Sequence, residues 1–147
     1  MRALTIRRPW TDAILSGNKD WENRSWPIPD KFLGQVIALH AGKKYENKSA
    51  EMMERGYQPP KKEDSPTGII GLIMFDRFVS VTWPTDTPWL FGPFGWHIRG
   101  VAPLETPIPC KGALGFWRVP EDVEAKILEQ DYILKGIYNN LLVKQER

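Results

Sequence analysis

One short segment gathers the side chains best suited to chemistry. It spans residues 17–26 and reads Gly-Asn-Lys-Asp-Trp-Glu-Asn-Arg-Ser-Trp. Side chains alternate along a strand, so Glu22, Arg24 and Trp26 are expected to share one face, with Lys19 just before them at a turn. This group of charges can hold a polar or anionic ligand, or it can be a solvated ion pair worth only about 0–1 kcal/mol. The spacing alone leaves both interpretations open.

Tryptophan is frequent, with seven among 147 residues, and three of these surround the charged segment. Most are expected to fill the core or brace loops. Trp21 falls on the strand face opposite Glu22 and is the best candidate for the core. Trp10 and Trp26 are candidates for a cleft, where a stacked base would gain roughly 1–3 kcal/mol.

A second group of polar residues follows an apolar run. His40 ends that run, and it is either a structural histidine or a side chain that points into the cleft. The small residues after it, Ala41 and Gly42, predict a loop whose backbone could approach a phosphate, with Lys43 supplying charge. Further basic residues that could follow a nucleic-acid backbone are Arg7, Arg8, Lys44 and Arg99.

Metal and thiol chemistry have little support in the sequence. Two histidines without a suitably spaced carboxylate or cysteine give no metal-ligand pattern, so neither a metal nor another cofactor is expected. Cys110 is the single cysteine, which excludes an internal disulfide. No His–Asp arrangement can be found around it, and a plain buried thiol is the favoured interpretation.

The elements that would position these residues indicate an α+β fold. Five to six short strands, broken by Gly and Pro and accompanied by two to four helices, are typical of a β-barrel or a curled sheet. The expected strands are 3–6, 21–26, 35–40, 68–80, 96–99 and 113–119, and the expected helices follow Pro9 and span 48–55, about 120 onward and 132–143. Residues 57–67 are expected to be an exposed loop, and 83–94 a loop ordered by aromatic packing.

Composition narrows the functional classes. The length suits a single domain, 1–147, with a helical C-terminal tail from about residue 120. The net charge of +2 is too small for a general polyanion binder, so any nucleic-acid site must be local. The longest apolar stretch, residues 69–75, is too short to cross a membrane. With one free thiol and no signal peptide at the start, a cytoplasmic location is expected.

The charged segment also carries a family resemblance. The pattern Pro9-Trp10, followed by Gly17-x-Lys19-x-x-Glu22-x-Arg24-x-Trp26, resembles the signature of the ASCH domain family, whose β-barrel is related to the PUA fold. Four further blocks resemble that family in the same order: residues 37–43, 68–71, 95–98 and 108–117. Together the match covers roughly residues 2 to 120.

The resemblance implies work on RNA. Family members bind RNA in a cleft between the barrel and its helices, some remove acyl groups from N4-acylated cytidine, and some are nucleases. In the amidohydrolases the Lys matched by Lys19 acts with a Thr and a distant Glu. Glu22 stands where that Thr would be, and no residue can be assigned to the distant Glu. A carboxylate there could activate water or accept hydrogen bonds from a base amino group.

The leading hypothesis is an RNA-binding domain that recognises single-stranded RNA or a modified nucleotide in one cleft. Its candidate binding residues are Trp10, Lys19, Glu22, Arg24, Trp26, His40 and Lys43. The first alternative is a metal-independent amidohydrolase on N4-acylated cytidine-type nucleosides, or a ribonuclease, with Lys19 and Glu22 as the catalytic pair. The second is an interaction module that docks a protein partner through the aromatic loop, residues 83–96.

Overall fold

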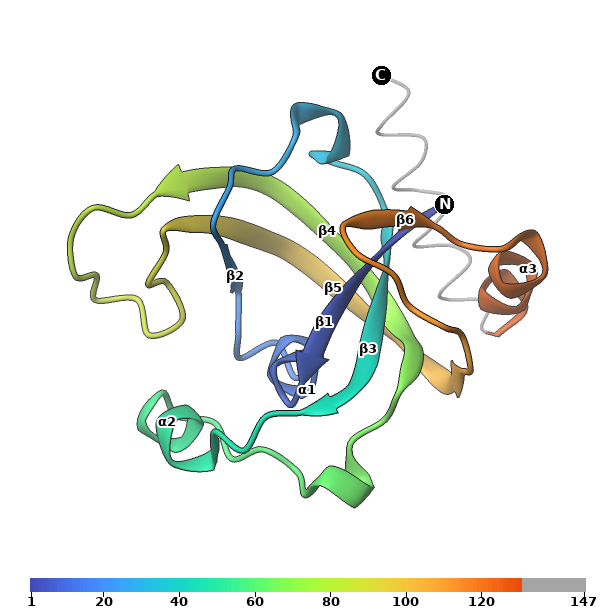
Figure 1. Cartoon of the computed structure of the whole chain (residues 1–147), viewed down its shortest axis with the longest axis horizontal. Coiled ribbons are helices and arrows are strands. Elements are labelled where there is room, and N and C mark those ends of the chain that lie inside the picture. The colour runs from blue at the N-terminus through green and yellow to red at the C-terminus, as the bar shows by residue number, and fades with distance from the viewer. Residues whose placement is uncertain (131–147) are drawn as a thin grey trace.

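Six strands pair into one mixed sheet in the computed structural model, which describes residues 1–130 (Figure 1). The strands lie in the order β2-β5-β4-β3-β1-β6, and every neighbouring pair is antiparallel except β1 and β3. The strands are β1 (Arg2–Arg8), β2 (Trp21–Arg24), β3 (Ile37–Tyr45), β4 (Gly68–Ser80), β5 (Phe94–Ile108) and β6 (Phe116–Arg118); the α-helices are α1 (Trp10–Leu15), α2 (Ser49–Glu54) and α3 (Glu121–Glu129). Two single 3₁₀ turns lie at Asp30–Phe32 and Lys62–Asp64.

The predicted α+β class and strand number are confirmed, but of the two predicted architectures the sheet is the curled one and does not close into a β-barrel. Its edge strands, β2 and β6, do not pair with each other in the described part of the chain. The sheet instead curls strongly, as Figure 1 shows. Trp96 on β5 stacks on Phe116 of β6 at 5.7 Å between ring centroids, although three strands separate β5 from β6. Side-chain packing rather than strand pairing therefore brings the two ends of the sheet together.

The curl is produced by two apolar faces with the period of two that strands impose. On β1, Leu4 and Ile6 belong to the cluster inside the curl, and Ala3, the residue before Leu4, belongs to the cluster on the other side. Helix α3 covers that outer cluster with Val123 and Ile127. Both faces of the sheet are therefore packed, which holds its curvature.

The predicted helix after Pro9 is confirmed as α1, and its end determines how the chain enters β2. Pro9 stands at its N-cap, and Gly17 turns the chain after it with φ at +82°, a conformation that favours glycine. The Lys19 N–H then donates to the Ala13 carbonyl at 3.1 Å. The helix thus ends in a tight turn that delivers residue 19 directly to the start of β2.

Several strand boundaries differ from those predicted. β2 ends at Arg24, two residues early, and β3 continues to Tyr45, so Lys43 lies in a strand and not in a phosphate-approach loop. β5 is far longer than the predicted 96–99, because its pairing with β4 continues through Pro103. β2 pairs with β5 only up to His97, so beyond that residue one side of β5 is an open edge and Pro is tolerated there.

The helix predicted over 48–55 is confirmed as α2, and the one after Pro120 begins at Glu121 as α3. The helix predicted over residues 132–143 lies outside the described residues. Within residues 1–130, none of the helices has the length and apolar character needed to span a membrane.

Candidate functional site

Lys19, Glu22 and Arg24 form one charged group at the start of β2. The Lys19 amine lies 3.4 Å from Glu22 Oε1, and the Arg24 guanidinium lies 3.3 Å from Glu22 Oε2. Lys19 Nζ also donates to the Trp21 carbonyl. One carboxylate is therefore shared by two cations, and the group carries one net positive charge.

Two members of this group are buried, unlike the residues of an ordinary surface ion pair, while the Arg24 side chain is 21% exposed. Lys19 is 2% exposed and Glu22 is 7% exposed. Burial lowers the pKa of Lys19, because the charged amine loses its hydration, and the Glu22 carboxylate opposes this effect without cancelling it. The interpretation as a solvated surface pair is therefore wrong for this cluster.

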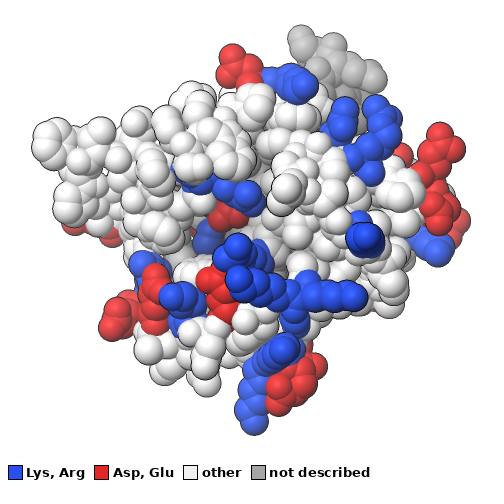
Figure 2. Space-filling view, in the orientation of Figure 1, with Lys and Arg blue, Asp and Glu red and all other residues white. Residues whose placement is uncertain are grey.

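The cluster forms part of the wall of a pocket of about 510 Å³, which we call the Lys19 pocket. The pocket lies in the gap between β2 and β1, where Arg24 Nη2 is 3.4 Å from the Thr5 carbonyl. Figure 2 shows Lys and Arg side chains gathered near the middle of this face, with carboxylates among them. Its lining residues are Thr5, Ile6, Arg7, Trp10, Lys19, Glu22, Asn23, Arg24, Phe91, Ala113, Leu114 and Gly115.

The structure places one of the two predicted stacking tryptophans in this pocket. Trp10 lines it, and its Nε1 donates to Glu46 at 3.4 Å. Trp26 lies beyond the end of β2, does not line the pocket and is half exposed, while its carbonyl accepts a hydrogen bond from Trp96. The structure therefore does not bring Trp26 into the lining of the Lys19 pocket, because strand alternation ceases to apply after Arg24. Trp21 is buried, as predicted.

Phe91 is a pocket residue that sequence reasoning missed. It comes from the long loop between β4 and β5, and its side chain is 50% exposed. Asn23 on β2 holds that loop in place: Asn23 Oδ1 accepts from the N–H groups of Phe91 and Gly92 at 3.0 and 2.8 Å. The density of aromatic residues in the loop was the only sequence signal, and it did not reveal which one faces the charged group.

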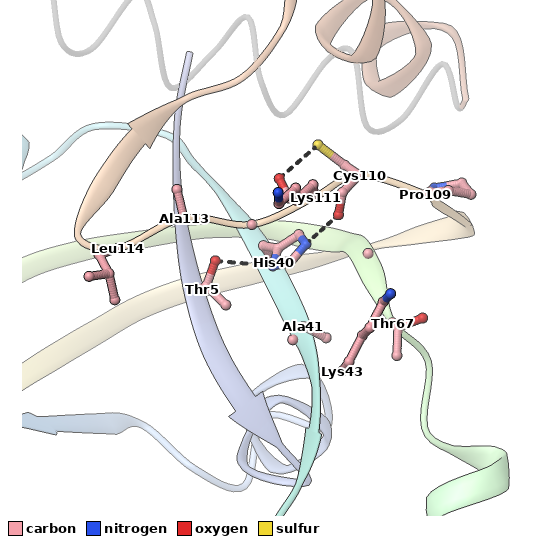
Figure 3. Close-up of a pocket in the computed structure, with 13 residues that line it drawn as sticks. Thr5, His40, Ala41, Lys43, Thr67, Pro109, Cys110, Lys111, Ala113 and Leu114 are labelled. Carbon is pink, nitrogen blue, oxygen red and sulfur yellow. Dashed lines mark hydrogen bonds between the residues drawn. The ribbon is translucent and has the colours of Figure 1, made fainter.

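His40 and Lys43 lie in a different pocket from Lys19, which corrects the prediction of one shared cleft. This second pocket, of about 860 Å³, we call the His40 pocket (Figure 3). It lies beside the Lys19 pocket, because both are lined by Thr5, Ala113 and Leu114. Its lining residues are Thr5, His40, Ala41, Gly42, Lys43, Thr67, Gly68, Pro109, Cys110, Lys111, Gly112, Ala113 and Leu114.

His40 is a structural histidine with a hydrogen bond on each ring nitrogen. Nε2 lies 2.6 Å from the Cys110 carbonyl, which can only accept, so Nε2 carries the proton. Nδ1 then accepts from the Thr5 hydroxyl at 3.0 Å, and Trp117 Nε1 donates to that same hydroxyl at 3.0 Å. This chain of bonds ties the loop after β5 to β1, β3 and β6. Burial lowers the pKa of His40, although the bond to Cys110 opposes this effect.

This network predicts a pH dependence of stability. The folded protein favours neutral His40, so below the ordinary pKa of 6.5 the unfolded chain binds the proton more readily. The contribution of His40 to the free energy of unfolding is therefore present above that pH. It should fall by at most about 1.4 kcal/mol per pH unit as the pH drops from 6.5 towards the lower folded pKa. Urea unfolding across pH 4.5–8 measures this slope.

The two histidines of the chain provide a matched control for that measurement. His40→Gln should remove this part of the slope, whereas His97→Gln should keep it, because His97 is bonded to Asp76 on β4 and lines neither pocket. A slope unchanged by His40→Gln would contradict the assignment.

Arg8, one of the basic residues considered from the sequence, has a structural role. The Arg8 guanidinium is buried and donates to four backbone carbonyls, those of Gly42, Lys43, Lys62 and Ser65. It is therefore unavailable to a nucleic-acid backbone, while its neighbour Arg7 is exposed.

Burial raises the pKa of the Cys110 thiol, which disfavours the nucleophilic thiolate. Among residues 1–130, no cluster of three or more His, Cys, Asp or Glu side chains has a metal-binding arrangement.

No model of a known protein family matches the chain, and no curated protein matches it either. A function for this protein therefore rests on the geometry and chemistry of the two pockets.

Proposed function

We propose that the protein is an ASCH-type domain related to the PUA fold, and that it binds single-stranded RNA or a modified nucleotide in the Lys19 pocket. The observation that carries the proposal is the buried Lys19–Glu22 pair, joined by the partly exposed Arg24, in the wall of a pocket of about 510 Å³. Removing charges from water costs several kcal/mol per ion, so a buried charged group that opens into a pocket is a candidate ligand site.

Arg24 has the free donors that such a role needs. Its two hydrogen bonds both use Nη2, to Glu22 and to the Thr5 carbonyl. Within residues 1–130, Nε and Nη1 make no hydrogen bond, so they can donate to a phosphate or a base carbonyl. The Glu22 carboxylate faces the same pocket and can accept from a base amino group.

Aromatic side chains provide a second kind of contact in the proposed complex, which is stacking on a base. Trp10 and Phe91 line the same pocket from different elements, and either ring can stack on a base. Single-stranded RNA is favoured because unpaired bases expose both the faces that stack and the edges that donate and accept hydrogen bonds. The combination therefore suits one nucleotide whose base is turned into the pocket.

A tryptophan-fluorescence titration with short single-stranded RNA tests the proposal. Saturable quenching is expected, because Trp10 lies in the pocket. Arg24→Gln should weaken binding by roughly 10- to 100-fold, the value of a hydrogen bond to a charged group. The Arg24 side chain is about 21% exposed, so this variant is expected to fold.

Arg99→Gln is the matched control, since Arg99 is exposed on β5 and lines neither the Lys19 pocket nor the His40 pocket. Its affinity should stay within about twofold of the native protein. Equal weakening by both substitutions would show a diffuse electrostatic attraction, and quenching by no RNA sequence would rule out the proposed binding.

An amidohydrolase acting on an N4-acylated cytidine-type nucleoside is the second candidate. It is favoured by the lowered pKa of Lys19 beside Glu22, because a less basic amine takes part more readily in proton transfer near neutral pH. Release of acetate from N4-acetylcytidine, in the presence of a chelator, would support this function. Glu22→Gln should then abolish turnover, whereas binding without turnover supports recognition alone.

A further inference from the structure

The His40 pocket offers a set of donors with no described role. Lys43 on β3 and Lys111 on the loop after β5 both line it, and neither forms an ion pair with any residue in 1–130. In the described chain, no Asp or Glu lines the pocket. With His40 neutral, its wall therefore carries two positive charges and no negative one.

The loop that closes this pocket adds backbone donors. Within residues 1–130, the N–H groups of residues 110–114 donate no hydrogen bond. The loop is nevertheless held in place, because the Cys110 carbonyl is bonded to His40. Gly112 lies so close to His40 and Thr5 that an added Cβ would come within 2.6 Å of both side chains. A fixed loop with unused N–H groups beside two lysines is an arrangement that binds anions.

Figure 3 shows how these donors lie around the pocket. Lys43 and Thr67 lie on one side, close to each other at β3 and the start of β4, and Cys110 and Lys111 lie on the loop opposite them. Leu114 lies apart from this group, at the stretch that the two pockets share. It is 98% exposed and lines both pockets, so its apolar side chain is accessible to a ligand that spans them.

We propose that the His40 pocket is a second subsite, which takes a phosphate group of the nucleic-acid backbone next to the nucleotide held in the Lys19 pocket. This inference rests on the proposed function. The shared residues Thr5, Ala113 and Leu114 make the two pockets adjacent, so one strand can occupy both while its sugar or base crosses Leu114. Lys43, Lys111 and the loop N–H groups then hold the phosphate. The preferred ligand is accordingly a strand of several nucleotides and not a free nucleoside.

Calorimetric titration in about 0.1 M salt tests the subsite with two ligands, a single-stranded tetranucleotide RNA and the matching nucleoside. The double variant Lys43→Gln, Lys111→Gln should weaken tetranucleotide binding about fivefold, from the counterion release expected for the one phosphate that the two lysines hold, and each single variant should weaken it less. The slope of log K against log salt should fall by about 0.7 in the double variant. Nucleoside affinity should not change.

Lys44→Gln is the control, because Lys44 is the exposed neighbour of Lys43 on β3 and does not line the pocket. It should change tetranucleotide affinity by less than about twofold. If the double variant binds the tetranucleotide with native affinity and salt slope while Arg24→Gln still weakens it, the subsite is overturned and the proposed function stands.

A second measurement separates the backbone phosphate from free phosphate and the subsite from the proposed function. Inorganic phosphate is titrated into the native protein and the double variant, and the amide NMR signals of residues 110–114 are followed. Shifts in the native protein alone, together with tetranucleotide binding, support the subsite. Such shifts without tetranucleotide binding overturn the nucleic-acid assignment and leave a site for free phosphate. If neither ligand binds, both the subsite and the proposed function are overturned.

Discussion

Glu22→Leu should lower the free energy of unfolding by about 3–5 kcal/mol, because it leaves the Lys19 amine buried without its carboxylate. Glu22 is also the partner of Arg24, so the same substitution places two cations side by side with nothing between them. Chemical denaturation measures the loss. Since burial already lowers the pKa of Lys19, the variant should regain stability as the pH rises and the amine loses its proton.

Glu51→Leu is the control for that result, because Glu51 pairs with Arg55 on exposed helix α2 and its side chain is 39% exposed. Its loss should be about 0.5 kcal/mol or less. The double variant Lys19→Met, Glu22→Leu should recover part of the stability lost by Glu22→Leu, since no buried charge is then left unpaired. A loss below about 1 kcal/mol for Glu22→Leu would show that Lys19 is not held as the structure has it.

Trp96→Ala should cost about 3–5 kcal/mol of the free energy of unfolding, the range for truncating a large aromatic side chain in a core. Trp96 is fully buried inside the curl, where its ring packs against Phe75 and stacks on Phe116. It also lies opposite Glu22 in the β2–β5 register, and the Arg24 guanidinium sits 5.6 Å from its ring centroid. Trp96→Ala is also expected to weaken RNA binding, because the Arg24 guanidinium loses the ring on which it lies.

The matched control is Trp83→Ala, which deletes the same side chain where it is 78% exposed. Its effect on the free energy of unfolding should stay within about 0.5 kcal/mol. Urea unfolding of both variants, followed by circular dichroism, compares them directly. Similar small losses at both positions would contradict packing of the two sheet ends through Trp96.

In the proposed complex, one pocket recognises a base and the other binds the backbone of the strand. The Lys19 pocket combines a charged group with two aromatic rings, which suits one base and its edge. The His40 pocket combines lysines with backbone N–H groups, which suits phosphate and carries no base preference. Specificity in the proposed complex therefore depends on Glu22 and Arg24, whereas the contribution of Lys43 and Lys111 weakens with salt.

Local features of the structure could be predicted from the sequence. Helix α1 begins after Pro9, as Pro at a helix start indicates, and it ends where Gly17 supplies the turn with positive φ. Lys19, Glu22 and Arg24 lie within six residues of one another, and a turn followed by a strand is enough to bring them together. The same alternation predicted that Trp21 is buried, although Glu22 on the opposite face is buried as well.

Features that depend on distant contacts could not be predicted in this way. Strand alternation predicted Trp26 in the cleft, but β2 pairs with β5 only from Trp21 to Arg24, and beyond that register the chain turns away. Phe91 reaches the pocket only because Asn23 holds its loop, a pairing separated by 68 residues. The alternating pattern gives the face of a residue within a strand, but it carries no information on where a loop between strands passes.

The sequence by itself thus determined the α+β class, the helix after Pro9 and the charged group of Lys19, Glu22 and Arg24, because each depends on residues a few positions apart. Only the tertiary structure decided that the sheet stays open and that His40 and Lys43 line a pocket of their own. The loop after β5 brings Lys111 to the His40 pocket. Residues 113 and 114 of the same loop line both that pocket and the Lys19 pocket. The path of this loop is set by bonds from His40 and Trp117 to partners far along the chain.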